Sequence, residues 1–172
     1  MSLLKILHYP DPFLKQVSEP VTQIDDGLKK LAADMAETMY AAPGVGLAAP
    51  QVGVAKRMVT LDCSPRDAAP RLVTAINPEI LVREEEVFEE EGCLSVPGFY
   101  ARVARSARVR VRFLDLEGKT VEMDAEGLWA VCFQHEIDHL DGILFVDHLS
   151  PLKKGMFRKR YKKIMEQLQE QL

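Results

Sequence analysis

The sequence contains little cysteine, no long apolar run and no excess of positive charge. Its three cysteines are widely separated in 172 residues, which is a poor basis for a disulfide framework and fits a reducing cytoplasm. A membrane-spanning helix needs about 18 consecutive apolar residues, whereas the longest apolar stretch covers only 127–133. The first residues include Lys5, His8 and Pro10 and lack the apolar centre of a secretory signal. We therefore expect neither a membrane partner nor export.

The charge balance excludes another broad class of protein. The chain has 22 basic and 26 acidic residues and a net charge of -4. A protein that follows nucleic-acid phosphates normally carries a positive excess, so we expect no specific DNA partner. Hydrophobic residues make up 47% and charged residues 28%, as in soluble globular proteins. No repeat or low-complexity linker divides the chain, so we predict a single domain over 1–172.

The order of the predicted elements indicates the α+β class. Apolar residues at helical spacing predict helices over 24–42, 127–140 and 153–172. The last helix is expected to bury a stripe formed by Phe157, Tyr161, Ile164, Leu168 and Leu172. Strands gather in the middle of the chain, and we predict them at 57–61, 72–76, 80–82, 87–88, 107–116 and 120–123. The segment Gly44–Gly53 contains too much glycine and alanine to predict a packed regular element.

The segment Gln134–Leu140, with the sequence QHEIDHL, carries the strongest chemical signal. His135 and His139 are four positions apart on a predicted helix, so they share one face, about 5–6 Å apart at Cβ. Two imidazoles can then converge on one metal ion at about 2.0–2.1 Å each. Glu136 can reach water at the ion as a general base. The alternative, two unrelated histidines at a solvated helix end, requires a coincidence in a chain with only 4 His.

A hydrolytic metal site needs a third protein ligand and an open position. His148 does not have the spacing of the metzincins, which directs attention upstream to Cys93 in the segment EGCLSVPG. A lone cysteine is most often a small buried hydrophobe, but a thiolate also binds zinc or iron. Cys63 and Cys132 keep the structural interpretation.

The glycine-rich segment Gly44–Gln51 is a further candidate. It lacks the Lys-Ser/Thr ending and the GxGxxG pattern of phosphate-binding loops. Glycine instead permits close approach of the backbone to a substrate. The Gln51 amide could donate a hydrogen bond to a developing oxyanion, although an ordinary polar side chain is the simpler interpretation of Gln51 alone.

Two other functions compete with a metallohydrolase. A cysteine hydrolase would use Cys93 as its nucleophile and a histidine as base, but it leaves the spacing of His135 and His139 unexplained. The second alternative is not an enzyme but a structural metal site or a pseudo-enzyme that binds nascent chains. A structural site would normally have four protein ligands and no open position. Only three convincing ligands are present. Chelation should spare a cysteine hydrolase, whereas alkylation should inactivate it.

Together the three segments resemble the peptide deformylase family, which is marked by a GxGLAAxQ loop, an EGCLS loop and a QHExDHL helix. They stand here in the family's order at 44–51, 91–95 and 134–140. The resemblance implies the family's α+β fold, with mixed or antiparallel sheets around the metal-binding helix and helices near both ends. It implies an enzyme that removes the N-formyl group from the initiator methionine of nascent polypeptides and releases formate.

The resemblance also implies roles for residues. The implied metal ligands are Cys93, His135 and His139. The family's usual ion is Fe2+, which Zn2+, Ni2+ or Co2+ can replace. The implied catalytic groups are the Glu136 carboxylate as acid/base, and the Gln51 side chain and Leu94 backbone N–H as oxyanion donors. Gly46 would bind the substrate through its backbone. The implied methionine pocket is lined by Val45, Leu128, Val131, Cys132 and His135.

Further expectations concern the surroundings of the site. Many family members carry an arginine shortly after the Cys loop, where this chain has 98–100, GFY, so contacts beyond the first substrate residue are expected to use aromatic surface. Asp138 is a candidate to orient an imidazole. The acidic run Glu84–Glu91 is predicted to be solvated apart from Glu91, which Arg102 and Arg105 could pair with.

The basic helix predicted over 153–172 has two interpretations. It is either a solvated surface or a contact with ribosomal RNA near the point where the substrate, an N-formylmethionyl nascent peptide, emerges. The helical end of the chain is similar to the type common in Gram-negative bacteria. The resemblance therefore implies a bacterial cytoplasmic enzyme with a possible ribosome partner.

Overall fold

Residues 2–171, which the computed structural model describes, form three α-helices and one five-stranded sheet. The helices are α1 (Asp26–Ala41), α2 (Gly127–Leu140) and α3 (Pro151–Glu170). The strands are β1 (Gly46–Ala48), β2 (Met58–Leu61), β3 (Val73–Cys93), β4 (Val96–Leu114) and β5 (Thr120–Glu126). Neighbouring strands are antiparallel and follow one another in chain order. The predicted α+β class is confirmed.

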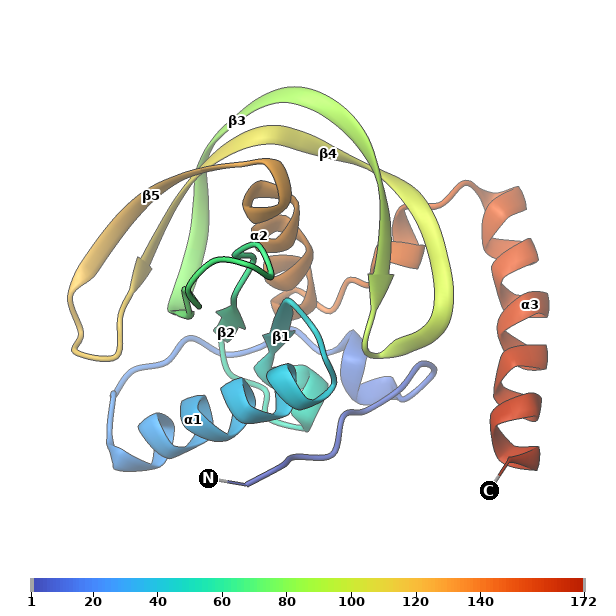
Figure 1. Ribbon diagram of the computed structural model, residues 1–172, viewed down its shortest axis with the longest axis horizontal. Helices are drawn as coiled ribbons and strands as arrows, with labels where there is room; N and C mark the ends of the chain where they lie inside the picture. Colours follow the sequence, from blue (N-terminus) through green and yellow to red (C-terminus); the bar gives the residue numbers. More distant parts are fainter. Residues whose placement is uncertain (1, 172) are drawn as a thin grey trace.

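The long hairpin of β3 and β4 arches over α2 (Figure 1). Three short strands were expected where β3 runs without interruption from Val73 to Cys93. Register shifts between Ile76 and Glu79 and after Ile80 bend the strand and change which residues face inward. The alternation of apolar and polar residues is therefore broken although the strand continues. This explains why the sequence predicts three short strands in place of one long strand.

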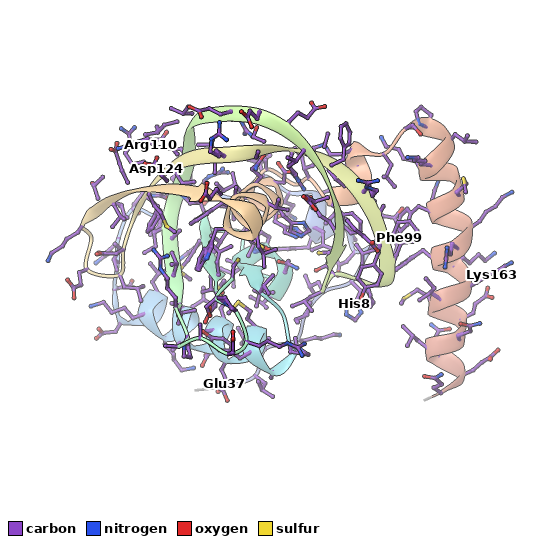
Figure 2. The ribbon with its side chains drawn as sticks, turned by 45° about the horizontal axis from the view of Figure 1, so that its top comes forward. His8, Glu37, Phe99, Arg110, Asp124 and Lys163 are labelled. Atoms are coloured by element: carbon purple, nitrogen blue, oxygen red, sulfur yellow. The ribbon has the colours of Figure 1, made fainter. Side chains whose placement is uncertain are left out.

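Buried and outward-facing residues alternate along the second half of β4, and the buried ones form the core between the sheet and α2. Val111 and Phe113 are buried, and the Phe113 ring stacks 6.1 Å from that of Phe133 on α2. The arginines on the opposite face point outward, where Arg110 pairs with Asp124 and Glu122 on β5 (Figure 2). One hydrophobic face and one charged face place α2 inside the concave side of the hairpin.

The expectation that Gly44–Gly53 lacks packed regular structure is wrong. The segment contains β1 and a 3-10 turn (Ala49–Val52), and Leu47, Ala48 and Ala49 are completely buried. Strand β1 pairs with β2 and lies against both α1 and α2. Small residues were taken as a sign of a loop, but here they permit close packing of backbone against two helices.

Helix α3 lies at one edge of the molecule (Figure 1). Phe157 and Tyr161 are buried, and the Tyr161 hydroxyl donates to the Tyr9 carbonyl at 3.1 Å. Leu168 is 41% exposed, so the predicted stripe is buried only in the first half of the helix; Leu172 lies outside the described residues. No helix within 2–171 has the length and apolarity to cross a membrane.

The turn that ends α2 depends on Gly142, which has a φ of 74°. A Cβ there would meet the Lys15 carbonyl oxygen and lie 2.7 Å from its carbon. We expect Gly142→Ala to lower the free energy of unfolding by at least about 2 kcal/mol, from left-handed strain and overpacking. Urea denaturation measures this. Gly155→Ala is the control: it lies within α3 with nothing within 4 Å, and should be neutral or stabilising. Equal effects of the two variants would contradict the prediction.

Candidate metal centre

Three ligand atoms from two elements converge beneath the hairpin. Cys93 ends β3, while His135 and His139 lie on one face of α2. All three ligand atoms lie within 4.8 Å of one another. Cys93 Sγ is 3.4 Å from His139 Nε2, which is 3.2 Å from His135 Nε2. Ions that bind nitrogen at about 2.0–2.1 Å and sulfur at about 2.3 Å fit such separations, and two imidazoles with a thiolate suit iron, zinc or similar ions.

A buried acidic group orients His135. Its Nδ1 lies 2.9 Å from Glu91 Oε1. Because a carboxylate only accepts, Nδ1 carries the proton and Nε2 is free to bind a metal. Glu91 is itself held by Arg105, whose Nε and Nη2 donate to its two oxygens at 2.7 and 2.9 Å. Arg102 instead donates to the Phe88 carbonyl, so only one of the two candidate arginines pairs with Glu91.

Arg105 also links the site to the surface. Arg105 Nη1 donates to Asp138 Oδ2 at 2.6 Å, and His148 Nε2 lies 2.8 Å from the same oxygen. Asp138 therefore contacts Arg105 and His148. This differs from the expectation that it orients a ligand imidazole. Burial raises the pKa of Glu91, but hydrogen bonds from Arg105 and His135 outweigh it and hold the pKa below its usual value. Glu91 remains an anion.

Burial and neighbouring charged groups shift the pKa values of His139, His135 and Glu136. Burial lowers the pKa of His139, and the neighbouring His135 lowers it further, which keeps this imidazole neutral. Burial also disfavours the charged form of His135, but Glu136, Cys93 and Glu91 outweigh it and raise its pKa. Burial raises the pKa of Glu136 to about 7.

Glu136 is the least satisfied group of the centre. Its side chain is buried, and Oε1 has no hydrogen-bond partner among residues 2–171. A partnerless buried carboxylate oxygen is costly. The missing partner is explained if Oε1 interacts with a molecule that enters the cleft. The carboxylate lies beside the ligand set, as the sequence motif predicts.

The Gln51 amide is held in a single orientation. Its Oε1 accepts from the Ala48 N–H at 2.9 Å, and its Nε2 donates to Ser95 Oγ at 3.0 Å. Nε2 also lies 3.6 Å from Cys93 Sγ. The sequence indicated Gln51 but not Ser95, because the pair is 44 residues apart and no local pattern links them.

Gln51, Cys93, His135 and Glu136 line a cleft of about 600 Å³. It brings together every residue expected for the methionine pocket: Val45, Leu128, Val131, Cys132 and His135. Val131 and Cys132 are buried, whereas Val45 and Leu128 are exposed. Val45 and Leu128 therefore lie at the mouth of the cleft. Gly46, Gln51, Leu94 and Glu136 also line the cleft.

The N-terminal arm completes the cleft, which the sequence did not predict. Its backbone is fixed by hydrogen bonds from Leu7 N to Gln51 O and from Tyr9 N to Ser95 O, both 2.7 Å. This places Ile6 and His8 in the lining. His8 and Phe99 lie on the same side of the molecule (Figure 2), and both line the cleft. Nothing in the spacing of the arm residues signals this role.

A Cys/His/His ligand set, a partnerless buried carboxylate and an open cleft define a metal-dependent hydrolase. A model of the polypeptide deformylase family matches residues 3–155. The chain belongs to this family.

Known relatives resemble the chain over nearly its full length. It is 56% identical to the peptide deformylase of Alkalilimnicola ehrlichii, over 97% of this chain and 93% of that protein. It is 53% identical to that of Thermodesulfovibrio yellowstonii, over 94% and 98%. The crystal structure of a Legionella pneumophila peptide deformylase has a TM-score of 0.92 at 46% identity, covering 99% of each chain. The Ehrlichia chaffeensis enzyme in complex with actinonin has a TM-score of 0.89 at 40% identity, over 95% and 98%.

Proposed function

We propose that the chain hydrolyses the formyl amide of N-formylmethionyl nascent peptides and releases formate, in the bacterial cytoplasm. Membership of the deformylase family supports this reaction. The observation that carries it is Glu136 Oε1, which is buried without a hydrogen-bond partner among residues 2–171, in the side chain next to the ligand set of Cys93, His135 and His139. This arrangement holds a base next to a metal site in a cleft large enough for a peptide end.

Cys93, His135 and His139 would hold one ion per chain, and we propose Fe2+, with Zn2+, Ni2+ or Co2+ as possible substitutes. A divalent ion in this site supplies Lewis-acid chemistry, which activates water and polarises a carbonyl oxygen. The donor set fits because the thiolate and both imidazole Nε2 atoms face one another, and because Glu91 fixes the tautomer of His135.

The chain's own groups then move the protons and carry the charge. Glu136 accepts a proton from the attacking water as the new C–O bond forms at the formyl carbon. It gives the proton to the leaving amine as the C–N bond breaks. A pKa near 7 suits both directions of transfer near neutral pH. The Gln51 Nε2–H and the Leu94 N–H are proposed to donate to the oxygen that becomes negative, each worth about 3 kcal/mol of barrier.

The first side chain of the substrate would enter the pocket formed by Val131 and Cys132. Val45 and Leu128 would line the exposed mouth of the same pocket, and His135 would also be part of its lining. The backbone of Gly46 lies on β1, the edge strand of the sheet, where an extended peptide can accept and donate main-chain hydrogen bonds.

Metal removal is the direct test of this function. We expect anaerobically purified protein to release formate from formyl-Met-Ala-Ser in proportion to its bound metal. Chelation should abolish the release, and Fe2+ should restore it. Formate release that survives chelation but is lost on alkylation would indicate a cysteine hydrolase. Full metal occupancy without formate would indicate a binding protein.

We further propose that the basic face of α3 contacts ribosomal RNA. Seven lysines and arginines lie on this helix in an otherwise acidic chain: Lys153, Lys154, Arg158, Lys159, Arg160, Lys162 and Lys163. Lys159 and Lys163 are exposed, and Figure 2 shows Lys163 pointing away from the body. Exposed cations of this kind bind phosphates by counterion release.

Charge reversal separates this contact from catalysis. We expect Lys159→Glu combined with Lys163→Glu to weaken binding to purified ribosomes by at least 10-fold and to reduce its salt dependence. Formate release from the tripeptide should be unchanged. The control reverses Lys29 and Lys119, which are exposed elsewhere. Equal ribosome binding by both double variants would refute the contact.

A further inference from the structure

Gly46 on β1 lies directly against the catalytic carboxylate. A Cβ built on Gly46 would collide with Glu136 Oε2 and lie 2.9 Å from Cδ and 3.0 Å from Cγ. The three nearest atoms all belong to Glu136. Real Cβ atoms are essentially never found this close to other atoms. The side chain that Gly46 lacks would therefore occupy the space that holds the carboxylate.

The backbone does not explain this glycine. The chain has glycines at positive φ, but Gly46 is not among them, and it pairs regularly with Leu61 in the β1–β2 ladder. Any L-residue could adopt its conformation. Glycine within a strand is unfavourable because it loses more entropy on folding and packs nothing. Space is required at this position, and the atoms that would compete for it belong to Glu136.

Neighbouring glycines have different surroundings. A Cβ on Gly44 would meet the end of the Leu94 side chain, 2.7 Å from Cδ1, which can rotate away. Gly53 has a φ of 82° and nothing within 4 Å. Among the glycines of this segment, Gly46 is the one at which a Cβ would take the space of the catalytic carboxylate.

Glu136 has little freedom to avoid an added methyl group. It is 4% exposed, and because Cγ as well as Oε2 would lie against the new methyl group, the whole side chain and not only its end would have to move. We infer that Gly46 is a positioning residue. Because it has no side chain, the Glu136 carboxylate can occupy the space next to β1, beside the metal ligands. The inference rests on the proposed acid/base role of Glu136. Misplacement of a catalytic group by about 1 Å can cost 100-fold in rate.

The variant Gly46→Ala tests this directly. We expect kcat for formyl-Met-Ala-Ser to fall by about 100-fold, with a much smaller change in KM. Bound metal should stay at the wild-type level, because none of the atoms nearest to the new methyl belongs to a ligand. Gly155→Ala, where a Cβ would meet nothing within 4 Å, is the control and should retain full activity. Full activity of Gly46→Ala would overturn the inference.

A double-mutant cycle with Glu136→Ala distinguishes positioning from general damage to β1. Removing the Glu136 side chain beyond Cβ removes the three nearest atoms, so Gly46→Ala should lower Tm in the wild-type background and leave it unchanged in Glu136→Ala. The same loss of Tm in both backgrounds would refute the inference. If Glu136→Ala itself kept full activity, the acid/base assignment would fail, while the Tm cycle would still decide where the carboxylate is held.

Discussion

Glu136→Gln is expected to lower kcat for formate release by about 1,000-fold while the metal content stays at one ion per chain. An amide has nearly the volume of the carboxylate, so the space beside Gly46 remains filled. It cannot accept the proton of the attacking water, and positioned general acid–base groups contribute roughly 10²–10⁴-fold. Cys93, His135 and His139 keep their places, so substrate binding should change little. Steady-state formate release with metal quantified in the same samples measures the effect.

A second glutamate with one buried oxygen provides the control. Glu37 on α1 also has a buried carboxylate oxygen without a partner among the described residues, and Figure 2 places it on α1, outside the lining of the cleft. Glu37→Gln should leave kcat unchanged. Activity retained by Glu136→Gln would remove Glu136 from the reaction and favour Cys93 as a nucleophile. Loss of metal from Glu136→Gln would instead make Glu136 part of the binding site.

The parts of the site that the sequence predicts are those set by local geometry. Four positions on a helix bring His135 and His139 together, and the structure places both beside Cys93. The helix of residues 127–140 was predicted with the bounds that α2 has. Its apolar faces were recognisable because it is buried on nearly all sides.

The parts that the sequence does not predict depend on long-range pairing. Glu91 and His135 are 44 residues apart, and their contact exists because the hairpin brings the end of β3 onto α2. The N-terminal arm reaches the cleft through two backbone hydrogen bonds, which no side-chain pattern encodes. The packed β1 segment was misread because its small residues serve close approach, as Gly46 does against Glu136, and composition does not distinguish this from a loop.

Arg105→Met is expected to destabilise the protein by about 3–5 kcal/mol, the usual cost of removing one partner of a buried ion pair. The Arg105 side chain is 4% exposed and holds two carboxylates, Glu91 and Asp138. Methionine fills much of the volume but removes the guanidinium that both acids share, and leaves them only the imidazoles of His135 and His148. Glu91 would then orient His135 less firmly, and loss of such outer contacts typically lowers metal affinity 10- to 100-fold. Urea denaturation of the metal-loaded protein and chelator competition measure the two effects.

Two further variants show whether the loss comes from uncompensated charge. Arg102→Met, on the same strand, removes a guanidinium that only donates to a carbonyl, and should cost less than about 1 kcal/mol. Adding Glu91→Gln to Arg105→Met removes one stranded charge and should recover part of the stability, because a neutral amide is cheaper to bury than an unpaired carboxylate. It should not recover metal affinity, since the carboxylate that accepts from His135 Nδ1 is gone. Recovery of neither would mean that Arg105 acts through packing and not through the charge of Glu91. Recovery of both would mean that metal affinity does not depend on the Glu91 carboxylate.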